Sequence, residues 1–224
     1  MSELQNRLDK LTLRLDRMGM RAEQAVIDAI HSVEDSDVDA GLAVDRNDTV
    51  IDREEVEIEQ ECIRLLALYQ PAAVDLRSIC TIIKVNSDLE RIADLAASIG
   101  RRAKHVALDE VVLNDHPVFN QLAQDTLDVL GKTVRMLSTR DAVTAQRVIQ
   151  SDPRIDDGYR QFVASVLENE GERTGGAETA MTMINLGKAL ERIGDLCTNI
   201  AEDIIFLQTG DIVRHGRAFD AKAS

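Results

Sequence analysis

The sequence predicts an all-α protein of six long helices that form two pseudo-symmetric, antiparallel three-helix bundles. Three observations support this fold class. Apolar residues recur every three or four positions along nearly the whole chain, glycine and proline number only 12 and 3 of 224 residues, and one acidic motif occurs twice. The helical period is not interrupted by any sustained alternation of the strand type. An apolar content of 44% is enough to build a sizeable core.

Six helices are expected in order along the chain. Periodicity and helix-start and helix-stop signals place them at about 2–33, 37–69, 71–105, 117–138, 139–169 and 177–209. Pro71 stands where a helix can begin, and Asp115-His116-Pro117 is typical of a helix N-cap. Pro153 falls inside the fifth helix, where we expect it to kink that helix or start it afresh. Because the turns are short, consecutive helices must lie antiparallel to bury their apolar stripes.

An internal repeat is the strongest signal in the sequence. Residues 89–95 read LERIADL and residues 190–196 read LERIGDL, at an offset of 101 with one difference. A second correspondence, at an offset of 104, relates residues 48–52 to residues 152–156. Self-similarity of this kind marks a tandem architecture. The chain is therefore expected to divide into a first bundle at 1–106, a linker at 107–116, a second bundle at 117–210 and a C-terminal tail at 211–224.

Each repeated motif carries two acidic residues four positions apart, on one face of a helix. Like charges at this spacing repel, so the pairs call for a compensating group. Solvent exposure beside Arg91 and Arg192 is one compensation, and a hard divalent or trivalent cation is the other. Both interpretations stay open from the residues alone. The candidate metal ligands form two sets, Asp48, Asp52, Glu90 and Asp94 in the first bundle and Asp152, Asp156, Glu191 and Asp195 in the second.

A metal site built from these residues has oxygen ligands only, which favours iron, manganese, magnesium or calcium over zinc or copper. None of the four histidines lies three or four residues from an acid of these motifs, so the Glu-x-x-His pattern of di-iron bundles is absent. No phosphate-binding loop, dinucleotide fingerprint or nucleophile elbow occurs. We therefore expect neither an enzyme nor an organic cofactor.

Composition and the N-terminal sequence indicate which classes of partner and which cellular location to expect. A net charge of −14 and an aromatic content of 3% argue against nucleic acid. The first 19 residues alternate charge with leucine, unlike a signal peptide, and no stretch approaches the ~20 apolar residues that a membrane span needs. Cys62, Cys80 and Cys197 are expected to be reduced core thiols. The sequence thus predicts a cytoplasmic chain that reaches a membrane only through its partners.

Several motifs carry a resemblance to a known family. Residues 70–77 (QPAAVDLR), followed by Ile82-Ile83-Lys84 and the first acidic motif, resemble the first half of PhoU, the accessory protein of the phosphate-specific transport system. Residues 189–195, Asn199-Ile200 and residues 210–215 (GDIVRH) resemble its second half. The resemblance covers nearly the whole chain. It implies tandem PhoU repeats whose acidic Glu/Asp-x-x-x-Asp motifs hold iron or other metal ions.

The resemblance also implies a role. PhoU-like proteins lie between the phosphate ABC transporter, through its ATPase PstB, and the sensor histidine kinase PhoR. There they negatively regulate high-affinity phosphate uptake and phosphate-starvation signalling, and a homodimer is the family expectation. Two alternatives have no phosphate role: a carboxylate-bridged iron-binding helical protein and a purely structural helical scaffold.

Overall fold

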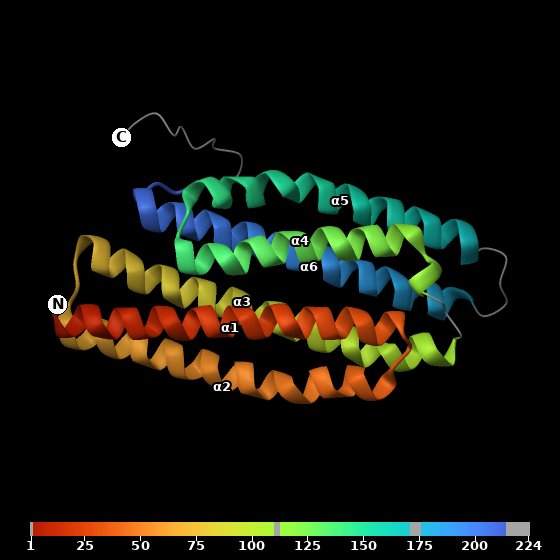
Figure 1. The fold of residues 1–224 in the computed structure, drawn as a ribbon, viewed down its shortest axis with the longest axis horizontal. Coiled ribbons are helices and arrows are strands. Elements are labelled where there is room, and N and C mark those ends of the chain that lie inside the picture. Colours follow the sequence, from red (N-terminus) through yellow and green to blue (C-terminus); the bar gives the residue numbers. More distant parts are fainter. Residues whose placement is uncertain (1, 110–112, 171–175, 214–224) are drawn as a thin grey trace.

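A computed structural model describes residues 2–109, 113–170 and 176–213, and this part of the chain is helical without any strand. The elements are α1 (Glu3–Glu34), α2 (Val38–Tyr69), α3 (Ala73–Leu108), the 3-10 helix η1 (Leu113–Asp115), α4 (Pro117–Thr139), α5 (Ala142–Glu170) and α6 (Gly176–Thr209). The chain reverses at each turn, so consecutive helices are antiparallel (Figure 1). The predicted all-α fold with six long helices is confirmed. Among the described helices, none is long and apolar enough to cross a membrane.

Side-chain caps fix where several helices begin. The Ser2 hydroxyl accepts a hydrogen bond from the Gln5 amide at 3.2 Å, and the Asp37 carboxylate accepts one from the Ala40 amide at 2.9 Å. These bonds satisfy amide groups that have no partner within the helix. His116 caps α4 through its Nδ1, 3.3 Å from the Phe119 amide, and Pro117 is the first helical residue. The predicted cap before α4 is therefore confirmed.

The prediction was wrong at Pro71 and is narrowed at Pro153. Helix α3 begins at Ala73 rather than at Pro71, because the chain must first reverse between Gln70 and Ala73, which both adopt left-handed backbone conformations (φ 45° and 47°). Of the two outcomes expected at Pro153, a kink or a fresh start, the fresh start is excluded, since α5 runs through Pro153 as one helix. The missing proline amide removes one backbone hydrogen bond. Burial of Val148 and Ile155 on either side holds the helix together.

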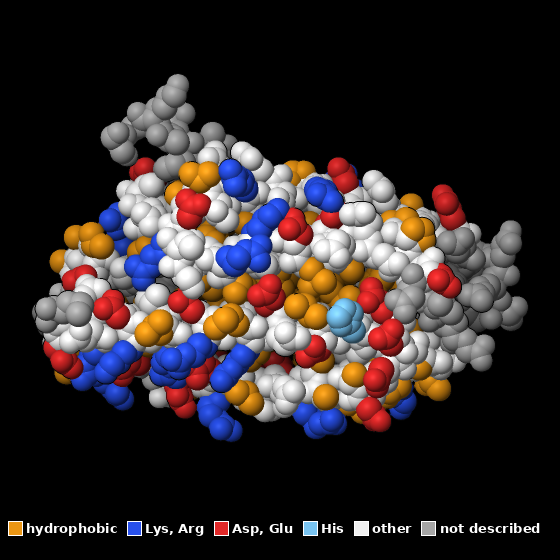
Figure 2. All heavy atoms as spheres, in the orientation of Figure 1, with side chains coloured by type: hydrophobic (Ala, Val, Ile, Leu, Met, Phe, Trp, Pro, Cys, Tyr) orange, Lys and Arg blue, Asp and Glu red, His pale blue; other side chains and the backbone are white. Residues whose placement is uncertain are grey.

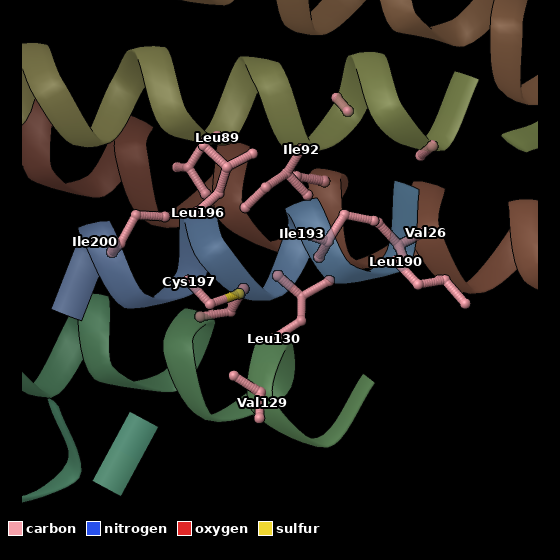
Figure 3. Close-up of a cluster of buried hydrophobic side chains, with 14 of the residues drawn as sticks. Val26, Leu89, Ile92, Val129, Leu130, Leu190, Ile193, Leu196, Cys197 and Ile200 are labelled. Carbon is pink, nitrogen blue, oxygen red and sulfur yellow. The ribbon is translucent and has the colours of Figure 1, made fainter. Parts of the chain in front are cut away.

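The two bundles share a single hydrophobic core. Helix α3 packs against α6 and α1 packs against α4, which joins the first three helices to the last three. The first acidic motif contributes Leu89 and Ile92 to this core and the second contributes Leu190 and Ile193, each at most 1% exposed (Figure 3). Hydrophobic side chains also reach the surface along the seam between α1 and α4 (Figure 2). Core formation thus fixes how the two repeats sit against each other.

The three cysteines are free, and Cys62 and Cys197 are buried while Cys80 is partly buried. Burial raises the pKa of both the Cys62 and Cys197 thiols to about 12. Thiols of this kind stay protonated and pack as small apolar groups. They contribute to the core and not to the site described below.

Small residues allow the second and third helices of each bundle to cross closely. In the first bundle a Cβ on Gly41 would lie 2.3 Å from the Gly100 carbonyl oxygen, and one on Gly100 would lie 2.6 Å from the Gly41 oxygen. The offsets of 104 and 101 place Ala145 and Ala201 at these positions in the second bundle, and both are fully buried. The backbones of α2 and α3 therefore approach more closely than any side chain at Gly41 permits.

Replacement of Gly41 by alanine should destabilise the protein. Alanine ordinarily favours a helix over glycine by ~1 kcal/mol, but here the new methyl group must force two backbones apart. We expect the melting temperature of Gly41→Ala to fall by about 5 °C or more in a thermal-denaturation experiment. Gly158→Ala in α5 is the control, because its Cβ would first meet the flexible Leu122 side chain at 3.3 Å. An equal fall in both variants would contradict the close-crossing argument.

Candidate metal centres

The two acidic motifs point away from the core. Leu89 and Ile92 are buried, whereas Glu90 is partly exposed and Asp94 is exposed. Residues four apart lie on the same side of a helix, so Glu90 and Asp94 share one face of α3. The second motif repeats this division on α6. In both α3 and α6, the motif therefore packs apolar side chains into the core on one side of the helix and presents carboxylates on the other side.

In the first bundle the carboxylates converge as predicted. Asp48 and Asp52 of α2 and Asp94 of α3 each offer one oxygen, and these three oxygens lie within 4.8 Å of one another. Glu90 is not part of this triad but is close enough to act on it, since its charge adds to burial and to the charges of Asp52 and Asp94 in raising the pKa of Asp48. The triad thus joins two consecutive antiparallel helices through residues that lie far from the turn between them.

The second bundle contains the pseudo-equivalent group with a different membership. Asp156 of α5 with Glu191 and Asp195 of α6 forms the triad of oxygens within 4.8 Å. Asp152 lies beside it and accepts a hydrogen bond from the Thr198 hydroxyl at 3.2 Å. All eight candidate residues therefore lie in or next to one of two acidic clusters. We call them cluster 1 (Asp48, Asp52, Glu90, Asp94) and cluster 2 (Asp152, Asp156, Glu191, Asp195).

Electrostatic strain is high in both clusters. Burial, and then the charges of Asp52 and Asp94, raise the pKa of Asp48 to about 7. In cluster 2, burial followed by the charges of neighbouring carboxylates raises the pKa of Asp195 to about 6. Carboxylates that are crowded and partly desolvated resist ionisation for these two reasons. Each cluster therefore favours either a proton or a cation.

Two oxygen atoms lack partners in these clusters. Asp48 Oδ1 and Glu191 Oε2 are buried and form no hydrogen bond. A buried polar atom without a partner costs free energy, and such atoms call for an explanation such as an ion. The donor set consists of carboxylate oxygens alone, and hard cations prefer such ligands. On these observations the residues fit an oxygen-ligated metal ion.

One residue of the site was not predicted from the sequence. Lys188 lies one turn before Glu191, and its ammonium group is 2.6 Å from Glu191 Oε1. The spacing of three residues on a helix was the available signal. Ser87 occupies the corresponding position in the first bundle at the offset of 101. Cluster 2 is therefore partly neutralised by the protein itself, whereas cluster 1 has no lysine in that place.

The arginines beside the motifs form no ion pair with the carboxylates of clusters 1 and 2 among the described residues. Arg91 is 3.6 Å from Asp88 of its own helix, and this is its ion pair among the described residues. Arg192 forms no ion pair with any residue that the structure describes. Neither guanidinium therefore removes the repulsion within its cluster.

Comparison with known proteins places this arrangement in a family. A family model described as the PhoU domain matches the chain twice, over residues 15–103 and 119–204. The phosphate-specific transport system accessory protein PhoU of Serratia marcescens is 30% identical over 211 residues, covering 93% of this chain and 85% of that protein. The PhoU homologue of Pseudomonas aeruginosa is 32% identical over 208 residues, covering 93% and 86%.

Solved structures agree with the sequence comparison. The crystal structure of PhoU from Pseudomonas aeruginosa superposes with a TM-score of 0.89 at 30% identity, covering 93% of this chain and all of that one. PhoU from Streptococcus pneumoniae, described as a phosphate transport system regulatory protein, has the same fold with a TM-score of 0.85 at 23% identity. Since the domain model matches most of both repeats and the relatives align along nearly the full length, this chain belongs to the PhoU family.

Proposed function

We propose that this protein is a non-enzymatic regulator of phosphate homeostasis. The observation that carries the proposal is the PhoU domain match in both halves, together with relatives named as accessory proteins of the phosphate-specific transport system. In this role it bridges the ATPase PstB of the phosphate ABC transporter and the sensor histidine kinase PhoR. It restrains uptake and starvation signalling from the cytoplasmic side, as a homodimer.

The acidic clusters are proposed to hold metal ions in support of that role. Asp48, Asp52 and Asp94 would be the ligands in cluster 1, and Asp156, Glu191 and Asp195 in cluster 2, with Glu90 and Asp152 beside them. A bound iron, manganese, magnesium or calcium ion supplies positive charge that offsets the repulsion and links two helices. The buried oxygens of Asp48 and Glu191 without partners support this reading.

The two clusters are proposed to differ in affinity. Lys188 already donates to Glu191 in cluster 2, so a cation entering there must displace or share that contact. Cluster 1 holds the carboxylate with the larger rise in pKa and has Ser87 in place of the lysine. The repulsion that a cation relieves is therefore greater in cluster 1, and cluster 1 should fill first.

Metal binding is tested by elemental analysis of untagged protein. We expect the wild type to retain metal after Mn²⁺ loading and desalting. The variant with Glu90, Asp94, Glu191 and Asp195 all changed to alanine should retain less than about a tenth as much, because each triad loses ligands from α3 or α6. Equal metal content in both proteins would show that the ions bind elsewhere, and metal in neither would reject the metal sites.

Repulsion in cluster 1 predicts a stability change that depends on pH. The pKa of Asp48 lies near 7 in the folded protein and at 3.8 ordinarily, so its ionisation destabilises the fold. That loss is absent below pH 4, grows between pH 4 and 7, and is complete above pH 7. After allowance for solvent screening of a half-exposed group, removal of the charge should contribute about 1 kcal/mol.

We therefore expect metal-free Asp48→Asn to melt about 3 °C above metal-free wild type at pH 8, and at the same temperature at pH 4. Saturating Mn²⁺ at pH 8 should reverse the order, because only the wild type retains the full triad. Differential scanning calorimetry with and without chelator measures both differences. A metal-free variant that is no more stable than wild type at pH 8 would contradict the repulsion argument.

Docking on partners tests the regulatory role directly. The purified wild type should bind both PstB and the cytoplasmic part of PhoR in biolayer interferometry. Glu90→Lys combined with Glu191→Lys should weaken at least one of these complexes by about tenfold, since both charges lie on the acidic faces. Asp9→Lys combined with Glu168→Lys is the control, because it makes the same change in net charge at exposed sites of α1 and α5.

Two results would count against the proposal. If the wild type bound neither PstB nor PhoR, the bridging role would be wrong. If the Glu90 and Glu191 variant bound both partners as the wild type does, and circular dichroism showed it folded, the acidic faces would not be the docking surface.

A further inference from the structure

A cleft of about 580 Å³ lies between α3 and α6, and three arginines line it. Arg91 and Arg101 come from α3 and Arg192 comes from α6. Guanidinium groups gathered at one place in a chain of net charge −14 are not explained by the overall charge. Their fork of N–H donors matches the oxygens of a phosphate or carboxylate group.

The cleft is built from the internal repeat. At the offset of 101, Arg91 corresponds to Arg192, Asp94 to Asp195, and Ser98 to Asn199, and all six residues line it. The two halves therefore present the same kinds of group from opposite sides. A small ligand with several equivalent oxygens suits such a site, because it can accept hydrogen bonds from both halves at once.

Two of the arginines are available to a ligand. Within the described part of the chain, Arg192 makes no ion pair, and the one ion pair of Arg91 is the 3.6 Å contact with Asp88 of its own helix. Arg101 is already engaged by Asp45 of α2. Ser98 is also prepared to donate, because Arg102 donates a hydrogen bond to its oxygen at 2.5 Å and leaves the hydroxyl proton free.

The two aspartates of the cleft decide which anion fits. Sulfate offers only acceptors and would be repelled by Asp94 and Asp195. Phosphate near neutral pH keeps at least one O–H group, which can donate to a carboxylate while the remaining oxygens accept from the arginines. A lining that combines arginine with aspartate therefore favours phosphate over sulfate. Sulfate has no O–H group to donate to the aspartate carboxylates, and a buried acceptor left without a donor costs binding free energy.

Each of these aspartates also belongs to an acidic cluster, Asp94 to cluster 1 and Asp195 to cluster 2. Their charge opposes any anion unless it is compensated. The cation sites proposed above would compensate it at both ends of the cleft, so this inference rests on that part of the proposed function. Phosphate binding and cation binding should then be coupled, each strengthening the other.

We propose that this cleft is a binding site for inorganic phosphate, held by Arg91 and Arg192 and assisted by Ser98 and Asn199, in the protein whose acidic clusters carry cations. The protein would in this way respond to phosphate itself. The site joins the two repeats across α3 and α6, so its occupancy acts on the contact between them.

The test is equilibrium dialysis of Mn²⁺-loaded, desalted protein against radiolabelled phosphate, with metal content measured on the same samples. We expect saturable binding that a tenfold excess of sulfate does not displace. Arg192→Gln and Arg91→Gln should each weaken phosphate binding by at least about tenfold without loss of metal. Arg64→Gln, at an exposed arginine of α2 remote from the cleft, is the matched control and should bind as the wild type does.

The possible outcomes distinguish failure of the phosphate site from failure of the metal sites. Metal bound without phosphate, phosphate binding unchanged in both arginine variants, or displacement by sulfate would each overturn the phosphate site and leave the metal sites standing. Absence of both metal and phosphate would overturn both. Phosphate binding that disappears with the arginines while metal is retained would support the site.

Discussion

Leu89 and Ile92 of α3 and Leu190 and Ile193 of α6 all lie in the shared core, and their burial sets the rotation of both helices (Figure 3). A helix has one rotation, so the burial of these side chains determines where the rest of each motif points. Glu90 and Asp94 are turned toward α2, and the same holds for cluster 2 on α6 and α5. The acidic clusters and the arginine-lined cleft are therefore consequences of how the repeats pack.

The repulsion within the two acidic clusters lowers the stability of the folded protein. Three carboxylate oxygens within 4.8 Å, with a pKa as high as about 7 for Asp48, would not be selected for the stability of an empty protein. The long helices tolerate this because each buries an apolar stripe along its full length, and the Gly41–Gly100 crossing holds α2 close to α3. Local repulsion supported by strong packing elsewhere is a feature of ligand sites.

The sequence predicted the architecture because its signals are local and repeated. Helical periodicity placed six helices within a few residues of their observed bounds. The N-cap pattern at His116 correctly predicted the start of α4. The pairing of Asp48 and Asp52 with Asp94 also followed, since antiparallel neighbours bring those faces together. The helix start predicted at Pro71 was wrong because a proline's preference for the first turn of a helix is weaker than the demands of the tight turn before Ala73.

What the sequence did not predict depends on contacts between the two repeats. No local pattern shows that Arg91 and Arg192 line one cleft, since that requires knowing that α3 packs against α6. Lys188 was missed for another reason. The candidate residues were found because they recur in both repeats, and Lys188, which pairs with Glu191, corresponds to Ser87 in the first repeat. The internal repeat was enough to locate the two acidic clusters, whereas positions at which the repeats differ, such as Lys188 and Ser87, distinguish one cluster from the other.

Those departures bear on how the two halves can work together. Arg101 in the first repeat corresponds to Glu202 in the second, so the cleft carries an extra positive group on the α3 side. Asp94 and Asp195 belong both to the cleft and to separate clusters, so a ligand in the cleft alters the charge environment of both clusters at once. Binding free energies that share a charged group are linked in both directions. A phosphate bound at the proposed site would thereby couple the two halves, which neither bundle could do alone.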